Sequence, residues 1–400
     1  MIYDLGATIY SCTECGGLLE VVYLDGELIS KAEDNKGWRD IPLSVWRYYP
    51  FLPISEGSFR ITLNEGGTGL HTAGKLAAFL GIGSIYVKNE GENPTGSFKD
   101  RGMTITVTKA LELGASTVIC ASTGNTSASL SAYGARGGLK RIVLIPSGKV
   151  AYGKLSQAMM CGAKVIQVQG NFDNSLEVVM ELALKHRDIY LVNSINPFRI
   201  EGQKTLGYEI IEQLGHVPDW IIMPVGNAGN ISAVWKGLLE FREMGLIEKL
   251  PRMVGVQAEG ASPIVDAFTK GNMQIVNTSR PETIATAIRI GAPVSWKKAL
   301  RAIGDSNGIA VKVSDNEILE AQGSLARLEG LFVEPASAAP IAGLKKLIQN
   351  GTISRDEEIV CVATGHGLKD PDIITKFYEK PVEVPAKLNA IETLLELSSR

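Results

Sequence analysis

The chain has 400 residues, and because a single hydrophobic core rarely grows past about 250 to 300 residues, we expect two domains. Its formal net charge of -3 argues against a polyanionic partner, which would call for an excess of Lys and Arg. The first residues lack a basic start followed by an apolar run, and no later segment approaches the roughly 20 apolar residues of a membrane span. We therefore expect a cytoplasmic protein with neither nucleic acid nor a membrane as partner.

The first 60 residues are expected to form an extension that packs against a larger body. A short hairpin-like stretch precedes the aromatic, Pro-flanked segment 45–51. Cys12 and Cys15 have the spacing of half a zinc ribbon, but a structural zinc ion needs four ligands, and no second Cys-x-x-Cys pair or nearby His pair follows. We therefore predict that this pair binds no metal.

From Ile85 onward, short β-branched runs alternate with helix-length amphipathic segments. This rhythm, with nearly continuous apolar strands, is typical of a parallel sheet covered by helices on both faces. The predicted fold class is therefore α/β, with a terminal helix over 387–397. The runs predicted to be strands are 85–87, 117–119, 142–145, 165–168, 221–223, 254–256 and 359–362.

Lys99 follows the first of these strands and stands where a helix is predicted to begin, behind a Gly-Ser turn. The positive end of a helix disfavours an ammonium group and lowers its pKa. The more neutral amine is the better nucleophile, as Schiff-base formation with an aldehyde cofactor requires. A surface lysine on an exposed first turn is the commoner explanation of any single Lys, so this motif does not decide the function alone.

Two further turns between a strand and a helix carry many small donors. The segment 121–129 is rich in hydroxyl groups, and with the backbone amides of a helix start these suit a carboxylate. Ser and Thr are also ordinary helix caps. The segment 226–230, Gly-Asn-Ala-Gly-Asn, has two glycines that let the backbone wrap a phosphate, although such turns also occur without ligands.

Two loops complete the set of candidate segments. Thr364, in the segment 364–370 after the last predicted strand, offers a hydroxyl group that can hydrogen-bond a ring nitrogen. Arg199 follows the amide- and hydroxyl-bearing run that starts at Asn193, and its guanidinium can bind a dianion through two parallel hydrogen bonds. A solvated loop cation is the alternative reading of that arginine.

Taken together and in this order, these segments resemble the fold-type II pyridoxal-phosphate-dependent enzymes, and among them the threonine synthase family most. The resemblance spans about residues 12–370 and is specific in combination. Its motifs are Asn-Pro-Thr-Gly-Ser-Phe-Lys-Asp-Arg at 93–101, Ser-Thr-Gly-Asn-Thr-Ser at 122–127, Asn-Ser-Ile-Asn-Pro-Phe-Arg-Ile-Glu-Gly-Gln-Lys at 193–204, Gly-Asn-Ala-Gly-Asn at 226–230, Ile-Ala-Thr-Ala-Ile-Arg-Ile-Gly at 284–291 and Thr-Gly-His-Gly-Leu-Lys-Asp at 364–370.

The resemblance implies two open, twisted, mainly parallel sheets flanked by helices, with the cofactor in a cleft between two domains. It also implies a homodimer. The implied parts of the chain are an N-terminal extension at 1–60, a large cofactor-binding domain at 61–104 and 199–372, a small nested domain at 105–198, and a C-terminal helical tail at 373–400.

The family reaction converts O-phospho-L-homoserine and water into L-threonine and phosphate. By resemblance, Lys99 holds pyridoxal 5'-phosphate as a Schiff base and then serves as the base at the α and β carbons of the substrate. The resemblance assigns the ring hydroxyl to Asn125 and the ring nitrogen to Thr364. The other implied cofactor-binding residues are Phe98, Gly226, Asn227, Ala228, Gly229 and Asn230, and the implied substrate-binding residues are Ser122, Thr123 and Thr126 for the carboxylate and Asn193, Ser194 and Arg199 for the phosphate.

Other activities of the same fold family use the same lysine, asparagine and glycine-rich turn. Threonine dehydratase, cysteate synthase and cysteine synthase are the competing enzymes, and Arg199 with the run 284–291 favours threonine synthase over them. A catalytically silent relative that serves as a binding protein is the remaining alternative, against which the presence of Lys99 argues.

Overall fold

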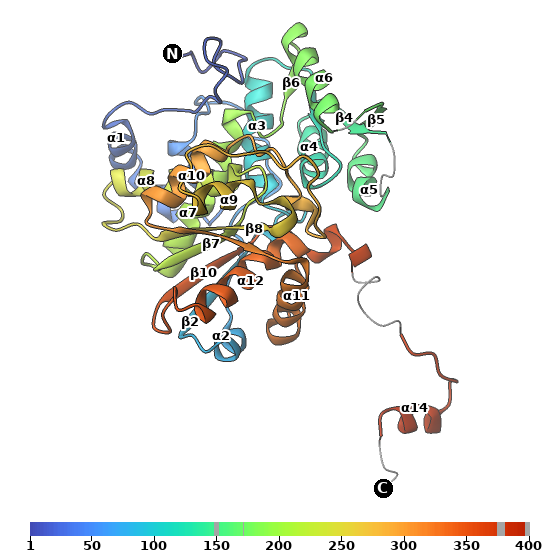
Figure 1. Cartoon of the computed structure of the whole chain (residues 1–400). Coiled ribbons are helices and arrows are strands. Elements are labelled where there is room, and N and C mark those ends of the chain that lie inside the picture. Colours follow the sequence, from blue (N-terminus) through green and yellow to red (C-terminus); the bar gives the residue numbers. More distant parts are fainter. Residues whose placement is uncertain (148–151, 171, 374–380, 397–400) are drawn as a thin grey trace. The chain divides into compact units, whose positions relative to one another are not determined.

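The structure is a computed structural model that describes residues 1–147, 152–170, 172–373 and 381–396. Within these residues the strands form two sheets (Figure 1). The larger sheet has the strand order β1-β2-β10-β7-β8-β9, and the smaller has the order β5-β4-β3-β6. All strand pairs are parallel except β1 with β2. The predicted α/β class with two mainly parallel sheets is confirmed.

The seven predicted runs all lie inside strands, and three strands were not predicted. Those three, β1, β6 and β9, are all edge strands of their sheets. Strands β1 and β6 have only three residues each, and a lysine interrupts the apolar run of β9. The strands are β1 Leu70–Thr72, β2 Ser84–Asn89, β3 Thr117–Ala121, β4 Lys140–Pro146, β5 Lys164–Val168, β6 Ile189–Leu191, β7 Trp220–Pro224, β8 Arg252–Ala258, β9 Ile309–Val313 and β10 Glu358–Ala363.

Helices cover both faces of the larger sheet, with α7 and α8 on one side and α11 and α12 on the other (Figure 1). Strand β7 is continuously apolar because both of its faces are covered. Ile221 packs in the hydrophobic cluster under α7 and α8, and Ile222 packs in the cluster under α11 and α12. The helices are α1 Glu27–Asp34, α2 Gly74–Leu80, α3 Lys99–Glu112, α4 Asn125–Arg136, α5 Tyr152–Met160, α6 Phe172–Lys185, α7 Pro197–Leu214, α8 Gly229–Glu243, α9 Pro263–Thr269, α10 Trp296–Asp305, α11 Asp315–Glu329, α12 Pro335–Gln349 and α14 Leu388–Leu394.

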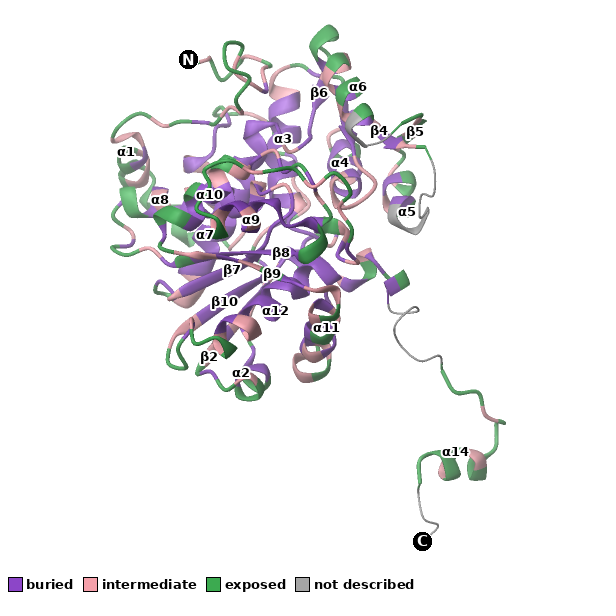
Figure 2. Ribbon diagram, viewed as in Figure 1, coloured by how far each residue is buried: buried purple, intermediate pink, exposed green. Residues whose placement is uncertain are grey.

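The first 60 residues contribute to the main core. Tyr48 and Phe51, in the 3₁₀ helix η2 (Val45–Phe51), are fully buried in the same cluster as Tyr208 and Phe241. The rings of Tyr208 and Phe241 stack at 4.2 Å between centroids. The neighbouring strands β7, β8 and β10 are drawn mainly in the colour of buried residues in Figure 2. The expected packing of the extension is therefore present, while the expected hairpin reduces to an isolated bridge between Ser11 and Leu18.

Helices α3 and α7 cross at two glycines, and this crossing positions the first turns of both helices. A Cβ on Gly102 would lie 2.8 Å from the carbonyl oxygen of Arg199, and a Cβ on Gly202 would overlap the carbonyl oxygen of Arg101. Only glycine permits so close an approach of two backbones. Because Lys99 and Arg199 each lie three residues before one of these glycines, the crossing brings the two side chains to the same place.

The segment Asp370–Arg400 forms a second compact unit, apart from Met1–Lys369. Its described helix α14 lies within the predicted 387–397, although Leu397 is outside the described residues, as is 374–380. In the described part of the chain, no helix has the length and apolarity to cross a membrane. The predicted domain boundaries near 104 and 198 fall inside α3 and α7, so the two sheets are joined through helices, and the division into domains stays a prediction.

Candidate active site

Lys99 is the first residue of α3, as predicted, and Phe98 occupies the position just before the helix. Phe98 is buried, and the Lys99 Nζ lies 3.9 Å from the centroid of its ring. Burial, reinforced by the positive charge of Arg199, lowers the pKa of Lys99 to about 7, while the charge of Glu334 acts in the opposite direction. The amine is therefore partly neutral near pH 7 and can act as a nucleophile or a base.

Backbone hydrogen bonds tie the turn before Lys99 to the loop after β10. The Phe98 amide donates to the Thr364 carbonyl at 3.0 Å, and the His366 amide donates to the Gly96 carbonyl at 2.9 Å. On the other side of this loop, the Glu334 amide donates to the Gly365 carbonyl at 3.0 Å. These three segments come from distant parts of the sequence and form one small layer beside the lysine.

This layer brings in two side chains that the sequence did not single out, Glu334 and Ser337. The Ser337 Oγ lies 3.1 Å from the Thr364 Oγ1, so it orients the hydroxyl group that was predicted to meet the ring nitrogen. Asn125, the first residue of α4, donates its Nδ2 to the Glu334 carboxylate at 3.1 and 3.2 Å. Glu334 is the middle residue of a Val-Glu-Pro sequence and lies just before α12, and only the tertiary structure reveals its closeness to Asn125.

The predicted carboxylate-binding residues lie in the turn before α4. Ser122, Thr123 and Thr126 are half-buried, and the Ser122 Oγ accepts a hydrogen bond from the Gly124 amide at 3.2 Å. The turn follows β3 and opens α4, so its free backbone amides stand at the positive end of a helix, where an anion is stabilised.

The predicted phosphate-binding turn follows β7 and opens α8. Ala228 has a φ of 66°, a left-handed conformation that costs energy in a non-glycine residue and is found most often where function requires it. Gly226 leaves room for the run 284–291, because a Cβ there would lie 3.1 Å from the Ala287 carbonyl oxygen. The Asn227 carbonyl accepts a hydrogen bond from the Ser295 amide at 3.1 Å. The run noted from resemblance therefore supports this turn from outside.

Three buried side chains, each in a different predicted segment, keep polar atoms without hydrogen-bond partners among the described residues. Both polar atoms of the Asn230 amide, the Ser97 Oγ and the Arg199 Nε are in this state. Buried polar atoms are normally paired, and a group that carries a phosphate and further hydrogen-bonding atoms would satisfy donors of this kind. The residues present therefore fit a phosphorylated cofactor or substrate.

Arg199 is buried in the first turn of α7, and burial lowers its pKa to about 10. One guanidinium nitrogen donates to the Val192 carbonyl at 3.2 Å. Asn193 behaves differently, because its amide bonds both the nitrogen and the oxygen of the Ala121 backbone, at 2.9 and 3.0 Å. Its side chain thus joins β3 to the loop after β6, with one donor and one acceptor site remaining. Ser194 is half-buried beside it.

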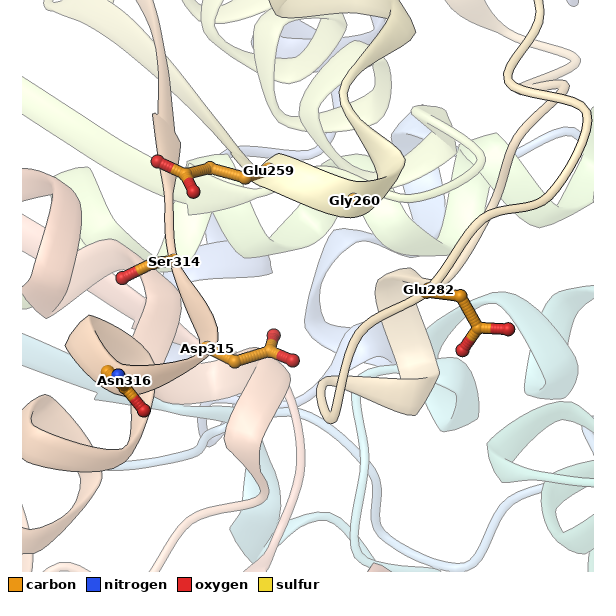
Figure 3. A pocket seen from close by; sticks show the side chains of 6 residues that line it. All are labelled: Glu259, Gly260, Glu282, Ser314, Asp315 and Asn316. Atoms are coloured by element: carbon orange, nitrogen blue, oxygen red, sulfur yellow. The ribbon is translucent and has the colours of Figure 1, made fainter.

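A cavity elsewhere in the molecule does not include any of the predicted residues. It has a volume of about 310 Å³ and is lined by Glu259, Gly260, Glu282, Ser314, Asp315 and Asn316. Figure 3 shows the carboxylates of Glu259 and Glu282 pointing away from one another. Within the described ranges no group of three or more His, Cys, Asp and Glu residues could hold a metal ion. The candidate active site therefore rests on the cluster around Lys99.

Comparison with known proteins agrees with this geometry. The family model "Pyridoxal-phosphate dependent enzyme" matches residues 61–365. The threonine synthase of Methanocaldococcus jannaschii is 58% identical, over 98% of this chain and 97% of the relative, and that of Methanosarcina acetivorans is 54% identical, over 97% and 95%.

Solved structures show the same fold at lower identity. Threonine deaminase isoform 2 from Solanum lycopersicum is 21% identical with a TM-score of 0.67, over 94% of this chain and 98% of that chain. The threonine deaminase of T.th. is 25% identical with a TM-score of 0.62, over 75% and 92%. With its fold-type II architecture and its match to curated relatives over nearly the full length, this chain belongs to the pyridoxal-phosphate-dependent enzymes and, within them, to the threonine synthase family.

Proposed function

We propose that the enzyme converts O-phospho-L-homoserine and water into L-threonine and phosphate, with Lys99 as the residue that bonds to the cofactor and moves protons on the substrate. The observation that carries the proposal is the position of the Lys99 amine at the start of α3, 3.9 Å from the centroid of the Phe98 ring. Burial there, with the charge of the nearby Arg199, lowers its pKa to about 7. An amine that is half neutral at working pH can both attack a carbonyl carbon and carry a proton.

Pyridoxal phosphate, when bound, supplies an aldehyde that bonds to an amine and a ring that withdraws electrons from the attached carbon atoms. The backbone of 226–230 at the N-terminus of α8 is suited to its phosphate, since helix N-termini stabilise anions. Asn125 and Thr364 are suited to the ring hydroxyl and the ring nitrogen. Phe98 packs beside the Lys99 amine and limits the directions in which that amine can point.

The substrate brings a second phosphate, and Arg199 is the group proposed to receive it. A buried guanidinium is costly unless an anion pairs with it, and its Nε has no partner among the described residues. Ser194 and the remaining donor of Asn193 lie on the same loop, and Asn230 completes the set from α8. The hydroxyl groups of Ser122, Thr123 and Thr126, with the amides of that turn, take the substrate carboxylate.

With the substrate held at both ends, we assign to the Lys99 Nζ the removal of a proton from the α carbon and then from the β carbon. After phosphate has left the γ carbon, a proton returns to that carbon, which becomes the methyl group of threonine. Water then adds its hydroxyl group at the β carbon, and a proton returns to the α carbon. Arg199 has two proposed roles: it holds the leaving phosphate, and its positive charge adds to burial, the larger cause, in lowering the pKa of Lys99.

The assignment of Lys99 is tested by borohydride reduction of the cofactor-loaded enzyme followed by peptide mapping. We expect the label on Lys99, and a label on another lysine would refute the assignment.

The substrate is tested separately by measuring phosphate release and ammonia release from candidate amino acids. Phosphate release with formation of threonine supports the proposal, whereas ammonia release from threonine would indicate a dehydratase.

The phosphate-binding role of Arg199 is tested with Arg199→Ala. We expect a KM for O-phospho-L-homoserine raised by about tenfold or more, because charged hydrogen bonds contribute about 1.5–3 kcal/mol. The matched control is Arg252→Ala, an arginine on the exposed start of β8, which should leave KM and kcat unchanged. Unaltered kinetics in Arg199→Ala would disprove the role.

The proposed homodimer and cytoplasmic location are tested by light scattering and by cell fractionation.

A further inference from the structure

Cys12 and Cys15 lie in a tight turn near the start of the chain, away from the candidate active site. The Cys12 amide donates to the Gly17 carbonyl at 2.8 Å, and the Gly16 amide donates back to the Cys12 carbonyl at 2.9 Å. Gly16 has a φ of 66°, a left-handed conformation that lets the chain reverse directly after the second cysteine. Such a turn holds the two cysteine side chains next to each other.

The Cys12 Sγ is surrounded by hydrogen-bond donors. The Tyr3 hydroxyl donates to it at 3.5 Å, and this bond, with the backbone amides of Cys15 and Glu14 and the Cys15 thiol, lowers the pKa of Cys12 to about 6. Cys12 is half-buried and Cys15 is exposed, so small molecules can reach both. Cys120 is the opposite case, because its complete burial raises its pKa to about 12.

The turn is anchored on both sides. Before it, Tyr10 is buried and its hydroxyl accepts a hydrogen bond from the Leu191 amide of β6 at 3.0 Å. After it, Glu20 forms an ion pair with Lys298 at 3.0 Å. Anchoring of the flanks fixes the turn that carries the two sulfur atoms, and the Tyr3 hydroxyl is held to this turn by a hydrogen bond from the Thr13 amide at 3.0 Å.

We propose that Cys12 and Cys15 form a redox-active dithiol that low-molecular-weight disulfides convert into an intramolecular disulfide. A metal site is the less favoured alternative, because zinc in structural sites takes four ligands and the described residues provide no group of three around this turn. A thiolate next to a second thiol is the arrangement that thiol–disulfide exchange requires.

In the exchange, the Cys12 thiolate attacks one sulfur of the small disulfide R–S–S–R, the S–S bond breaks, and RS⁻ leaves with the electron pair and takes a proton from water. Cys15 then loses its proton and attacks the Cys12 Sγ of the mixed disulfide, so the second RS⁻ leaves. The protein loses two electrons and two protons, and the small disulfide becomes two thiols. Reduction by an excess of small thiol runs the same steps in reverse.

The test uses the full-length enzyme loaded with its cofactor, incubated with oxidised glutathione at pH 7 and analysed by mass spectrometry without reduction. We expect an internal Cys12–Cys15 disulfide in the unaltered enzyme. In Cys15→Ser the reaction should stop at a glutathionyl adduct on Cys12. In Cys12→Ser, Cys15 should form its adduct roughly threefold to fivefold more slowly, since the larger thiolate fraction of Cys12 is partly offset by its lower intrinsic nucleophilicity.

Tyr3→Phe tests whether Cys12 reacts because of its hydrogen bonds or only because it is exposed. The variant removes the hydroxyl donor to the Cys12 Sγ and keeps the ring. In the Cys15→Ser background it should slow adduct formation on Cys12, and Tyr49→Phe is a control that should not. Equal adduct rates in Cys12→Ser and Cys15→Ser, or no internal disulfide, would overturn the proposal. Stoichiometric zinc that is bound through these thiols and blocks their oxidation would overturn it as well. Turnover of the reduced cysteine variants should equal that of the unaltered enzyme.

Discussion

Lys99 and Arg101 are two cations in the same first turn of α3, yet their surroundings differ completely. Arg101 is fully buried, with its Nε 2.6 Å from a Glu90 oxygen and its Nη2 2.7 Å from a Glu209 oxygen. Lys99 has no carboxylate within ion-pair distance among the described residues, and its pKa falls to about 7 through burial and Arg199. One turn of helix therefore carries both a fully paired cation that holds the structure together and an unpaired amine suited to chemistry.

The comparison teaches how a reactive amine is kept in place at a helix start. The paired charges around Arg101 join α3 to β2 and α7, since Lys88 also contacts Glu209 at 2.8 Å. Burial alone would raise the pKa of Glu209, but the charges of Arg101 and Lys88 outweigh it and hold the pKa well below its usual value. The unfavourable environment of Lys99 is tolerated because the rest of the same helical turn is strongly paired through Arg101.

The largest effect is expected from Arg101→Met, which leaves the carboxylates of Glu90 and Glu209 buried without their main cation. Breaking a buried ion pair from one side costs about 3–5 kcal/mol, to be measured by urea unfolding at pH 7. The control, Lys312→Met, removes an exposed pair with Asp266 and should cost about 0–1 kcal/mol. Equal losses in the two variants would show that the paired cluster does not hold α3.

The same cluster predicts a pH dependence of stability. The pKa of Glu209 is lower in the folded protein than in the unfolded chain, so its contribution is complete above the unfolded value of about 4.3 and is lost as the pH falls towards the folded pKa. Arg101→Met should therefore lose less stability between pH 5 and pH 3 than the unaltered enzyme. A parallel acid profile would contradict the assignment.

A smaller loss of stability is expected from Gly202→Ala. The added methyl group would push α3 and α7 apart where they cross, and this crossing brings Lys99 and Arg199 together. The new Cβ overlaps the Arg101 carbonyl, and overpacking of this kind costs about 1–3 kcal/mol. We expect kcat to fall even under conditions where the variant stays fully folded, because catalysis requires the reacting groups to be held at precise distances. Gly304→Ala is the matched control: its Cβ meets open space in α10, and it should stabilise the protein by about 0.5–1 kcal/mol.

The smallest expected change concerns the Lys99 amine itself. Arg199→Gln removes a positive neighbour and should raise the pKa of Lys99 by about 1 or less, whereas Glu334→Gln should lower it by a similar amount. The measurement is the pH dependence of acetylation of Lys99 in cofactor-free protein, followed by mass spectrometry. Shifts in the same direction for both variants would disprove that these two charges act on the amine.

Much of the fold was predictable because central strands of a doubly covered parallel sheet must be apolar along their whole length. The edge strand β6 escaped prediction because it is short: it is apolar along its length but has only three residues. The start of α3 at Lys99 followed from local turn chemistry, and so did the presence of a helix start within the segment 121–129. The role of Glu334 was not predicted, because no local sequence pattern indicates its contact with Asn125, more than 200 positions away.

The class of fold, the family and the candidate lysine could be read from the amino-acid sequence, since strand periodicity, helix starts and short polar motifs are local properties of the chain. Which charged side chains form ion pairs, and which do not, became clear only from the tertiary structure. Pairing of Arg101, the unpaired state of Lys99 and the reach of Asn125 to Glu334 depend on the crossing of α3 with α7 and on the layer beside β10. Such contacts between distant segments set the local electric field and the burial, and these determine the pKa of a side chain.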